Sequence, residues 1–144
     1  MSTVEDFEAP ASVTLTRRIE WIDTDAAGIY HWTTAFRLAE AAEAVMHTGL
    51  GIAELTFGRV PRVAVEVEFH RPLRFNDRVD VELAVERLGR TSLTYRLAIA
   101  GPEGSAAQGR LTVCCIDPDS GRAAPWPAEV RRALATGGRV DPSG

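Results

Sequence analysis

Two carboxylates, Asp23 and Asp25, lie close together after a predicted strand, in a turn that contains Gly28. An alanine-rich helix is predicted to start a few residues later. The start of a helix leaves backbone N–H groups without partners, so a carboxylate and free N–H donors can meet there around one substrate. The stretch from Arg18 to Trp32 is therefore the first candidate site.

The residues on either side of this turn have the periodicities of a strand and of a helix. Apolar residues fall on every second position over 13–21, apart from Arg17, which predicts a half-buried strand. A helix is predicted from Thr33 or Thr34, whose hydroxyls can cap a free N–H, to about Thr48. Its apolar residues recur at spacings of three and four. They are Ala35, Leu38, Ala39, Ala42, Val45 and Met46.

Four further strands and a short helix are predicted to complete an α+β fold. Alternation of apolar and polar residues predicts strands over 63–69, 79–86, 93–99 and 107–116. The turns between them are short, and short turns join antiparallel neighbours. A short, partly exposed helix is predicted over 127–135. Because one long helix cannot cover a five-stranded sheet, a second copy of the chain is expected to complete the burial.

The composition is that of one ordinary globular domain. The chain has 144 residues, 45% of them hydrophobic, and we expect a domain over 13–135 with mobile tails at 1–12 and 136–144. Its net charge of −4, with both signs interspersed, argues against nucleic acid and membrane partners. Neither a signal peptide nor a membrane span is apparent, which favours the cytoplasm. The adjacent Cys114 and Cys115 should face opposite sides of a strand, unlike a disulfide or a metal pair.

Three motifs, in this order of elements, resemble the hot-dog fold and specifically the 4-hydroxybenzoyl-CoA thioesterase family. The motifs are WIDTDAAGI at 21–29, FHRPLRFND at 69–77 and LGRTSL at 88–93, and the resemblance covers about residues 13–130. It implies a five-stranded antiparallel sheet wrapped around one central helix. It also implies hydrolysis of an acyl or aryl thioester of CoA or of a carrier protein, by a homodimer or homotetramer.

The same resemblance implies roles for single residues. Asp25 matches the catalytic aspartate, which attacks the thioester carbonyl or activates a water as general base. The backbone N–H of Trp32, seven residues on, matches the donor to the carbonyl oxygen. Arg90 and Ser92 match the turn that contacts CoA. The other expected substrate-binding residues are Gly28, Ile29, Tyr30, His31 and Phe36.

Several of these residues also have a plainer interpretation. Asp25 can fold its carboxylate onto the N–H groups of its own turn, and His31 can be an ordinary loop histidine. Asp23 is expected to organise the turn. Glu40 and Glu43 are expected on a solvated face rather than in the wall of an acyl pocket. The remaining histidines, His47 and His70, are expected to be structural or surface residues.

The sequence contains no zinc-ligand spacing, phosphate loop or nucleophilic-serine motif. We therefore expect catalysis without a metal or another cofactor. Two other functions remain open: a hot-dog hydratase or dehydratase that acts on acyl thioesters, and a protein that senses an acyl-CoA without cleaving it.

Overall fold

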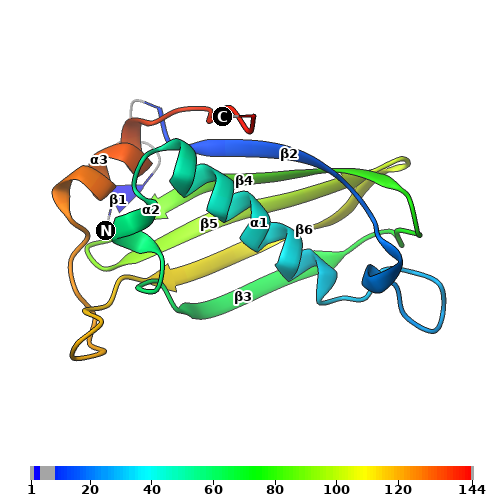
Figure 1. Cartoon of the computed structure of the whole chain (residues 1–144), viewed down its shortest axis with the longest axis horizontal. Coiled ribbons are helices and arrows are strands. Elements are labelled where there is room, and N and C mark those ends of the chain that lie inside the picture. The colour runs from blue at the N-terminus through cyan, green and yellow to red at the C-terminus, as the bar shows by residue number, and fades with distance from the viewer. Residues whose placement is uncertain (1, 4–8, 144) are drawn as a thin grey trace.

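One antiparallel sheet forms the body of the computed structural model, which describes residues 2–3 and 9–143 (Figure 1). Five strands lie in the order β2, β4, β5, β6, β3. The two-residue β1 also pairs with β4, beyond the residue of β4 at which the pairing with β2 begins. This confirms the predicted sheet. The elements are β1 (Ser2–Thr3), β2 (Ser12–Arg18), the 3-10 helix η2 (Trp21–Asp23), α1 (Thr34–Gly49), α2 (Ala53–Thr56), β3 (Arg62–Phe69), β4 (Arg78–Leu88), β5 (Ser92–Gly101), β6 (Gly104–Cys114) and α3 (Ala128–Thr136).

The long helix α1 lies across one face of the sheet (Figure 1). Ala35, Ala39 and Ala42 are buried on its inner face, and their small side chains let the helix approach the strands closely. Leu38 and Met46 fill the space between them and are almost fully buried. Burying a side chain of that size contributes roughly 1.5–3 kcal/mol. The central helix predicted from the sequence is therefore confirmed.

The first long strand is shorter than the sequence suggested. Strand β2 ends at Arg18, and Trp21 belongs to η2, where its side chain is 81% exposed. The cause is Asp23, whose carboxylate accepts a hydrogen bond from the Glu20 N–H at 2.7 Å and turns the chain. Alternation could not detect this turn, because Trp21 happened to continue the apolar pattern.

The sequence predicted that a threonine hydroxyl caps the start of α1, but the threonine at the cap position, Thr33, makes no such hydrogen bond. Instead, Nδ1 of His31 accepts the N–H of Thr33 at 3.2 Å. The hydroxyl of Thr34 donates to the backbone oxygen of Asp23 at 3.0 Å. A histidine ring thus replaces the expected hydroxyl, because the loop before the helix folds back over the helix start. The helix ends at Gly49, one residue later than predicted.

Strand β3 forms one edge of the sheet and pairs only with β6 among the described residues. Most of its residues are exposed, including Val63 (59%), Val65 (46%) and Phe69 (45%). The alternation that predicted a strand over 63–69 therefore located β3 correctly, but both of its faces are largely exposed. An edge strand with free N–H and C=O groups and exposed valines is a surface that another strand can cover.

The C-terminal helix α3 buries Val130 and Leu134, which are four residues apart, and most of its other residues are at least partly exposed, as predicted for 127–135. Beyond it, Gly138 donates to the backbone oxygen of Ala9 at 2.9 Å. The predicted mobile tail 1–12 falls partly outside the described residues, and mobility of both ends stays a prediction. None of the helices in residues 2–3 and 9–143 is long and apolar enough to cross a membrane.

Candidate functional site

The chain between η2 and α1 forms a short two-stranded hairpin, residues 23–31, which we call the site hairpin. The N–H of His31 donates to the backbone oxygen of Asp23 at 2.6 Å, and the N–H of Asp25 donates to that of Ile29 at 2.8 Å. The hairpin leads directly into the first residues of α1. The predicted catalytic carboxylate therefore lies in the hairpin, and the predicted oxyanion donor, Trp32, directly follows it.

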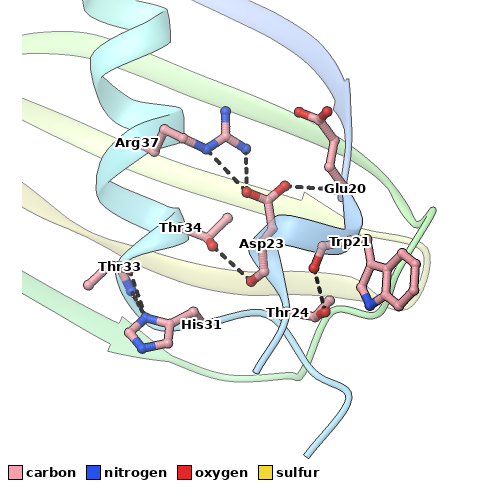
Figure 2. A network of polar contacts seen from close by, with 8 residues as sticks. All are labelled: Glu20, Trp21, Asp23, Thr24, His31, Thr33, Thr34 and Arg37. Atoms are coloured by element: carbon pink, nitrogen blue, oxygen red, sulfur yellow. Dashed lines mark hydrogen bonds and ion pairs between the residues drawn. The ribbon is translucent and has the colours of Figure 1, made fainter. Parts of the chain in front are cut away.

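Asp23 anchors the base of this hairpin (Figure 2). Its Oδ1 accepts hydrogen bonds from Arg37, from Nη2 at 2.7 Å and from Nε at 3.2 Å. Its Oδ2 accepts the N–H of Glu20, and its backbone oxygen accepts the hydroxyl of Thr34. With a side chain only 3% exposed, Asp23 organises the turn, as the sequence predicted.

Asp25 lies nearer the tip of the hairpin and is exposed. Its Oδ1 accepts the N–H of Ala27 at 2.8 Å, so the carboxylate does fold back onto its own turn. Among residues 2–3 and 9–143, no group donates to the second oxygen, Oδ2. Gly28 allows this tight turn, because its φ of 82° lies in the left-handed region that glycine adopts readily. One carboxylate oxygen is thus fixed and the other is available.

A groove of about 430 Å³ lies beside Asp25. The stretch just after β3 supplies the opposite wall, and the N–H of Tyr30 donates to the backbone oxygen of Leu73 at 2.7 Å, which holds the two walls together. The rings of Tyr30 and Phe69 meet edge to face at 6.1 Å. Burial raises the pKa of Tyr30, so its hydroxyl stays protonated. The groove is lined by Asp25, Ile29, Tyr30, Trp32, Phe69, His70, Arg71 and Pro72.

Trp32 lines this groove, two residues before the start of α1 at Thr34. Within the described part of the chain, no group accepts its backbone N–H, which makes it an available donor at a helix start. Its ring is 59% exposed and packs edge-on against Phe36 at 5.5 Å. The predicted residues Asp25, Ile29, Tyr30 and Trp32 are therefore brought together, with Phe36 behind Trp32.

His31 does not line the groove. Its Nδ1 lies 2.7 Å from Oγ1 of Thr33 and also accepts the N–H of that residue (Figure 2). The imidazole stacks against the ring of Trp32 at 6.0 Å. His31 borders a second hollow of about 340 Å³, lined also by Asp23 and Arg37. The structure thus gives the histidine contacts at the helix start and none with Asp25.

Arg90 and Ser92 lie at the other end of the sheet. Strand β4 begins beside Arg18, close to the site hairpin, and ends at Leu88 after 11 residues. At about 3.3 Å per residue, this strand separates the groove from the turn by roughly 30 Å. The backbone oxygen of Ser92 accepts the indole N–H of Trp126 at 3.0 Å. Within one chain, these two residues do not reach the groove.

Glu43 corrects a prediction, because it is buried rather than solvated. It is 8% exposed, and its two carboxylate oxygens accept hydrogen bonds from Arg62 of β3 at 2.7 and 3.0 Å. This ion pair makes burial of the charge possible. Glu40 is exposed, as predicted, and lies 3.7 Å from Arg62. A signal was available in the sequence, since Glu43 follows the buried Ala39 by four residues.

His47 extends this buried polar region. It is fully buried, with Nε2 at 2.7 Å from the hydroxyl of Tyr95 and Nδ1 at 2.7 Å from that of Thr56. Burial lowers the pKa of His47. Burial and the nearby Glu43 raise the pKa of Tyr95 well above its usual value. His47 is thus a buried residue held by hydrogen bonds, in line with the structural role predicted for it. Its partners, Thr56 and Tyr95, lie on other elements, so the spacing of residues in the sequence could not identify them.

His70, at the edge of the groove, is also held by neighbours. Its Nδ1 lies 2.9 Å from Oγ of Ser105, and its Nε2 lies 3.5 Å from Glu68. Cys114 and Cys115 are both free thiols, one half-buried and one buried. Across residues 2–3 and 9–143, no three His, Cys, Asp or Glu side chains gather as a metal site would require.

Comparisons with known proteins extend this description. The sequence profile of the thioesterase-like superfamily matches residues 18–134. A 1,4-dihydroxy-2-naphthoyl-CoA hydrolase of Rippkaea orientalis is 29% identical over 118 residues, which cover 76% of this chain and 86% of that protein. A protein of the same name from Prochlorococcus marinus is 30% identical, over 83% of this chain and 85% of that protein. The solved structure of a predicted thioesterase from Bacillus stearothermophilus has a TM-score of 0.78 at 27% identity, covering 85% and 93% of the two chains.

Proposed function

The chain belongs to the thioesterase-like superfamily, and from this premise we propose that it hydrolyses an aromatic acyl-CoA thioester in the groove beside Asp25. One observation carries the proposal: within residues 2–3 and 9–143, a carboxylate oxygen of Asp25 has no donor and the backbone N–H of Trp32 has no acceptor, and both residues border the same groove. A thioester carbonyl needs both groups, one at its carbon and one at its oxygen.

In the proposed reaction, Oδ2 of Asp25 acts at the carbonyl carbon. It either forms the new C–O bond itself, giving an anhydride that water then opens, or removes a proton from the water that forms that bond. The carbonyl oxygen becomes negative and accepts a hydrogen bond from the Trp32 N–H. Loss of one such donor costs on the order of 3 kcal/mol of barrier. Collapse of the intermediate breaks the C–S bond, and the sulfur leaves as a thiol after it takes up a proton.

An aromatic acyl group is the substrate class that the groove walls support. Tyr30, Trp32 and Phe69 present rings to the groove, and rings pack well edge to face against another ring. The relatives from Rippkaea orientalis and Prochlorococcus marinus are named 1,4-dihydroxy-2-naphthoyl-CoA hydrolases, and the acyl group of that CoA ester is a fused aromatic ring system. We therefore propose an aryl-CoA of similar size as the substrate, and a carrier-protein thioester as the alternative.

We also propose that the working form contains at least two copies of the chain, as a homodimer or a homotetramer. The support is the edge strand β3, which pairs only with β6 among the described residues and exposes Val63, Val65 and Phe69, the last of which also lines the groove. A second copy would cover this edge. It could also bring its Arg90 and Ser92 toward a groove that the same chain's residues do not reach. Two free cysteines fit a reducing compartment, which supports the cytoplasm.

The decisive experiment measures thiol release from aryl- and acyl-CoA esters by the wild type and by Asp25→Asn. We expect the variant to lose about 100-fold or more in kcat, the usual contribution of a general base or more. Asp117→Asn is a matched control, because Asp117 also accepts a backbone N–H in its own turn, from Asp119 at 3.0 Å, outside the groove. It should keep the wild-type rate.

Other outcomes of the same assay would contradict the proposal. Thiol release by Asp25→Asn at the wild-type rate would remove Asp25 from the reaction. Hydration of the acyl chain without thiol release would identify a hydratase. Tight binding of acyl-CoA without any turnover by the wild type would identify a sensor.

A further inference from the structure

Arg37 has no contact with the groove, yet it is tied to both reacting groups through Asp23. We propose that Arg37 is a positioning residue for thioester hydrolysis: through Asp23 it fixes Trp32 N–H and the Asp25 carboxylate in their reactive arrangement. This inference rests on the proposed function and adds a residue to it that no sequence motif indicated.

The first support is the place of the ion pair in the fold. Arg37 lies one turn into α1, and its guanidinium makes two hydrogen bonds to a single carboxylate oxygen of Asp23. The other oxygen of that carboxylate holds the N–H of Glu20, at the end of the first long strand. Asp23 therefore joins the sheet, the site hairpin and α1 at one point.

The second support is the set of contacts on either side of Trp32. The backbone oxygen of Asp23 accepts the N–H of His31, which precedes Trp32, and the hydroxyl of Thr34, which follows it. The N–H of Thr33 is held by the imidazole of His31. The neighbours of Trp32 are thus fixed, while no acceptor for its own N–H lies in the described part of the chain, which leaves this donor for substrate. Figure 2 shows the hydroxyl of Thr34 directed at the backbone oxygen of Asp23 and the ring of His31 beside Thr33.

The third support is the difference in exposure within the pair. The side chain of Asp23 is 3% exposed, whereas that of Arg37 is 48% exposed and borders the second hollow, which shares no lining residue with the groove. Without Arg37, the buried carboxylate loses its counter-charge and must turn toward water. Because the hairpin is built on Asp23, such a movement displaces both Asp25 and Trp32.

The test compares Arg37→Gln with the wild type under saturating and limiting aryl-CoA. A misplacement of reacting groups by about 1 Å can lower a rate about 100-fold, so we expect kcat to fall by about 10- to 100-fold. KM should change by less than about threefold, because Arg37 touches no groove wall. Methylguanidinium should restore part of the lost kcat, since the position of Arg37 is open to solvent.

Two further variants make the result specific. Arg110→Gln removes an exposed arginine that pairs with Glu86 at 2.6 Å and does not line the groove, and it should keep the wild-type kcat. Arg37→Lys keeps the charge and the helix propensity but loses the forked pair of donors. It should give an intermediate kcat, and it keeps the question answerable if Arg37→Gln does not fold.

An unchanged kcat in Arg37→Gln, or in Arg37→Lys if only that variant folds, would overturn the positioning role. So would a loss of kcat in folded Arg37→Gln that methylguanidinium does not restore. The failure of the proposed function itself would look different, because the wild type would then release no thiol from any CoA ester.

Discussion

His47 makes two hydrogen bonds in the interior, and they fit a neutral ring. A neutral imidazole donates from one nitrogen and accepts at the other, whereas a charged ring donates from both. Its partners are the hydroxyls of Thr56 and Tyr95, and the ring of Phe57 stacks on it at 6.1 Å. The charged groups nearest the ring are Glu43, which raises its pKa, and Arg62, which lowers it. Burial outweighs both and lowers the pKa.

This burial predicts how stability depends on pH. Because the pKa of His47 is lower in the folded than in the unfolded chain, the unfolded chain binds the proton more readily. The contribution of the neutral His47 to stability is therefore complete above about pH 6.5, the pKa of a histidine in the unfolded chain. This contribution is lost as the pH falls below that value. Each unit of pKa difference is worth about 1.4 kcal/mol. Urea unfolding at pH 7.5 and at pH 5.5 measures the effect.

The control for this prediction is His47→Gln, which keeps hydrogen-bonding capacity but cannot titrate. We expect the variant to be less stable than the wild type at pH 7.5 and to lose less stability between the two pH values. An equal loss in both proteins would assign the pH dependence to other groups.

At the residue scale, the sequence predicted what local spacing determines. The roles of Asp23 and the closeness of Asp25 to Trp32 follow from a few consecutive residues. The direction of the His31 ring does not, because it depends on a contact with Thr33 that forms only when α1 starts where it does. Burial of Glu43 depends on Arg62, which lies on another element.

Gly109 of β6 lies tightly against the backbone of β3. A Cβ built there would lie 1.9 Å from the backbone oxygen of Glu66 and 2.7 Å from Cα of Val67. Both are backbone atoms, so neither can move without shifting the strand. Gly109 is therefore required for the edge strand to pair with the rest of the sheet.

The expected result is that Gly109→Ala destabilises the protein by about 3 kcal/mol or more, because overpacking typically costs 1–3 kcal/mol when side chains can adjust. Gly101→Ala is the matched comparison, since its Cβ would meet only the flexible end of the Leu73 side chain at 2.4 Å. We expect the smaller loss there. Thermal unfolding of the two variants checks the order, and an equal or reversed order would show that β3 can shift.

At the element scale, periodicity worked best where a strand has one buried and one solvated face. The predicted strands over 79–86 and 93–99 lie inside β4 and β5, with boundaries off by one or two residues. It failed for β2, which Asp23 ends early. It also gave no warning that β3 is exposed on both faces, because period two records alternation and not what lies above the strand.

On the scale of the whole molecule, the open edge of β3 and the groove lie on the same side of the protein. Phe69 belongs to both, as the last residue of the strand and a wall of the groove. The proposed second copy would thus cover an apolar edge and limit the access of water to the site. The size of the predicted sheet could suggest that a second copy of the chain is needed to cover it. The sequence could not show which edge strand that copy would cover.

We expect the wild type to have at least twice the chain mass of 15.6 kDa in light scattering. Val65→Lys places a charge on the exposed edge and should give a monomer with little thiol release. Gln108→Lys is the control, because β6 is paired on both sides within the chain and the variant should keep mass and activity. A monomeric wild type with full activity would rule out the role of a second copy.

The site hairpin has a consequence for how such a protein diversifies. The residues proposed for the reaction lie in one uninterrupted stretch, Asp23 to Trp32, while the facing wall comes from 69–72, far along the chain. Mutations in the distant segment can alter which acyl group fits and leave the reacting groups in place. A change of substrate can therefore proceed by single mutations in residues 69–72, with each intermediate protein keeping its reacting groups in place.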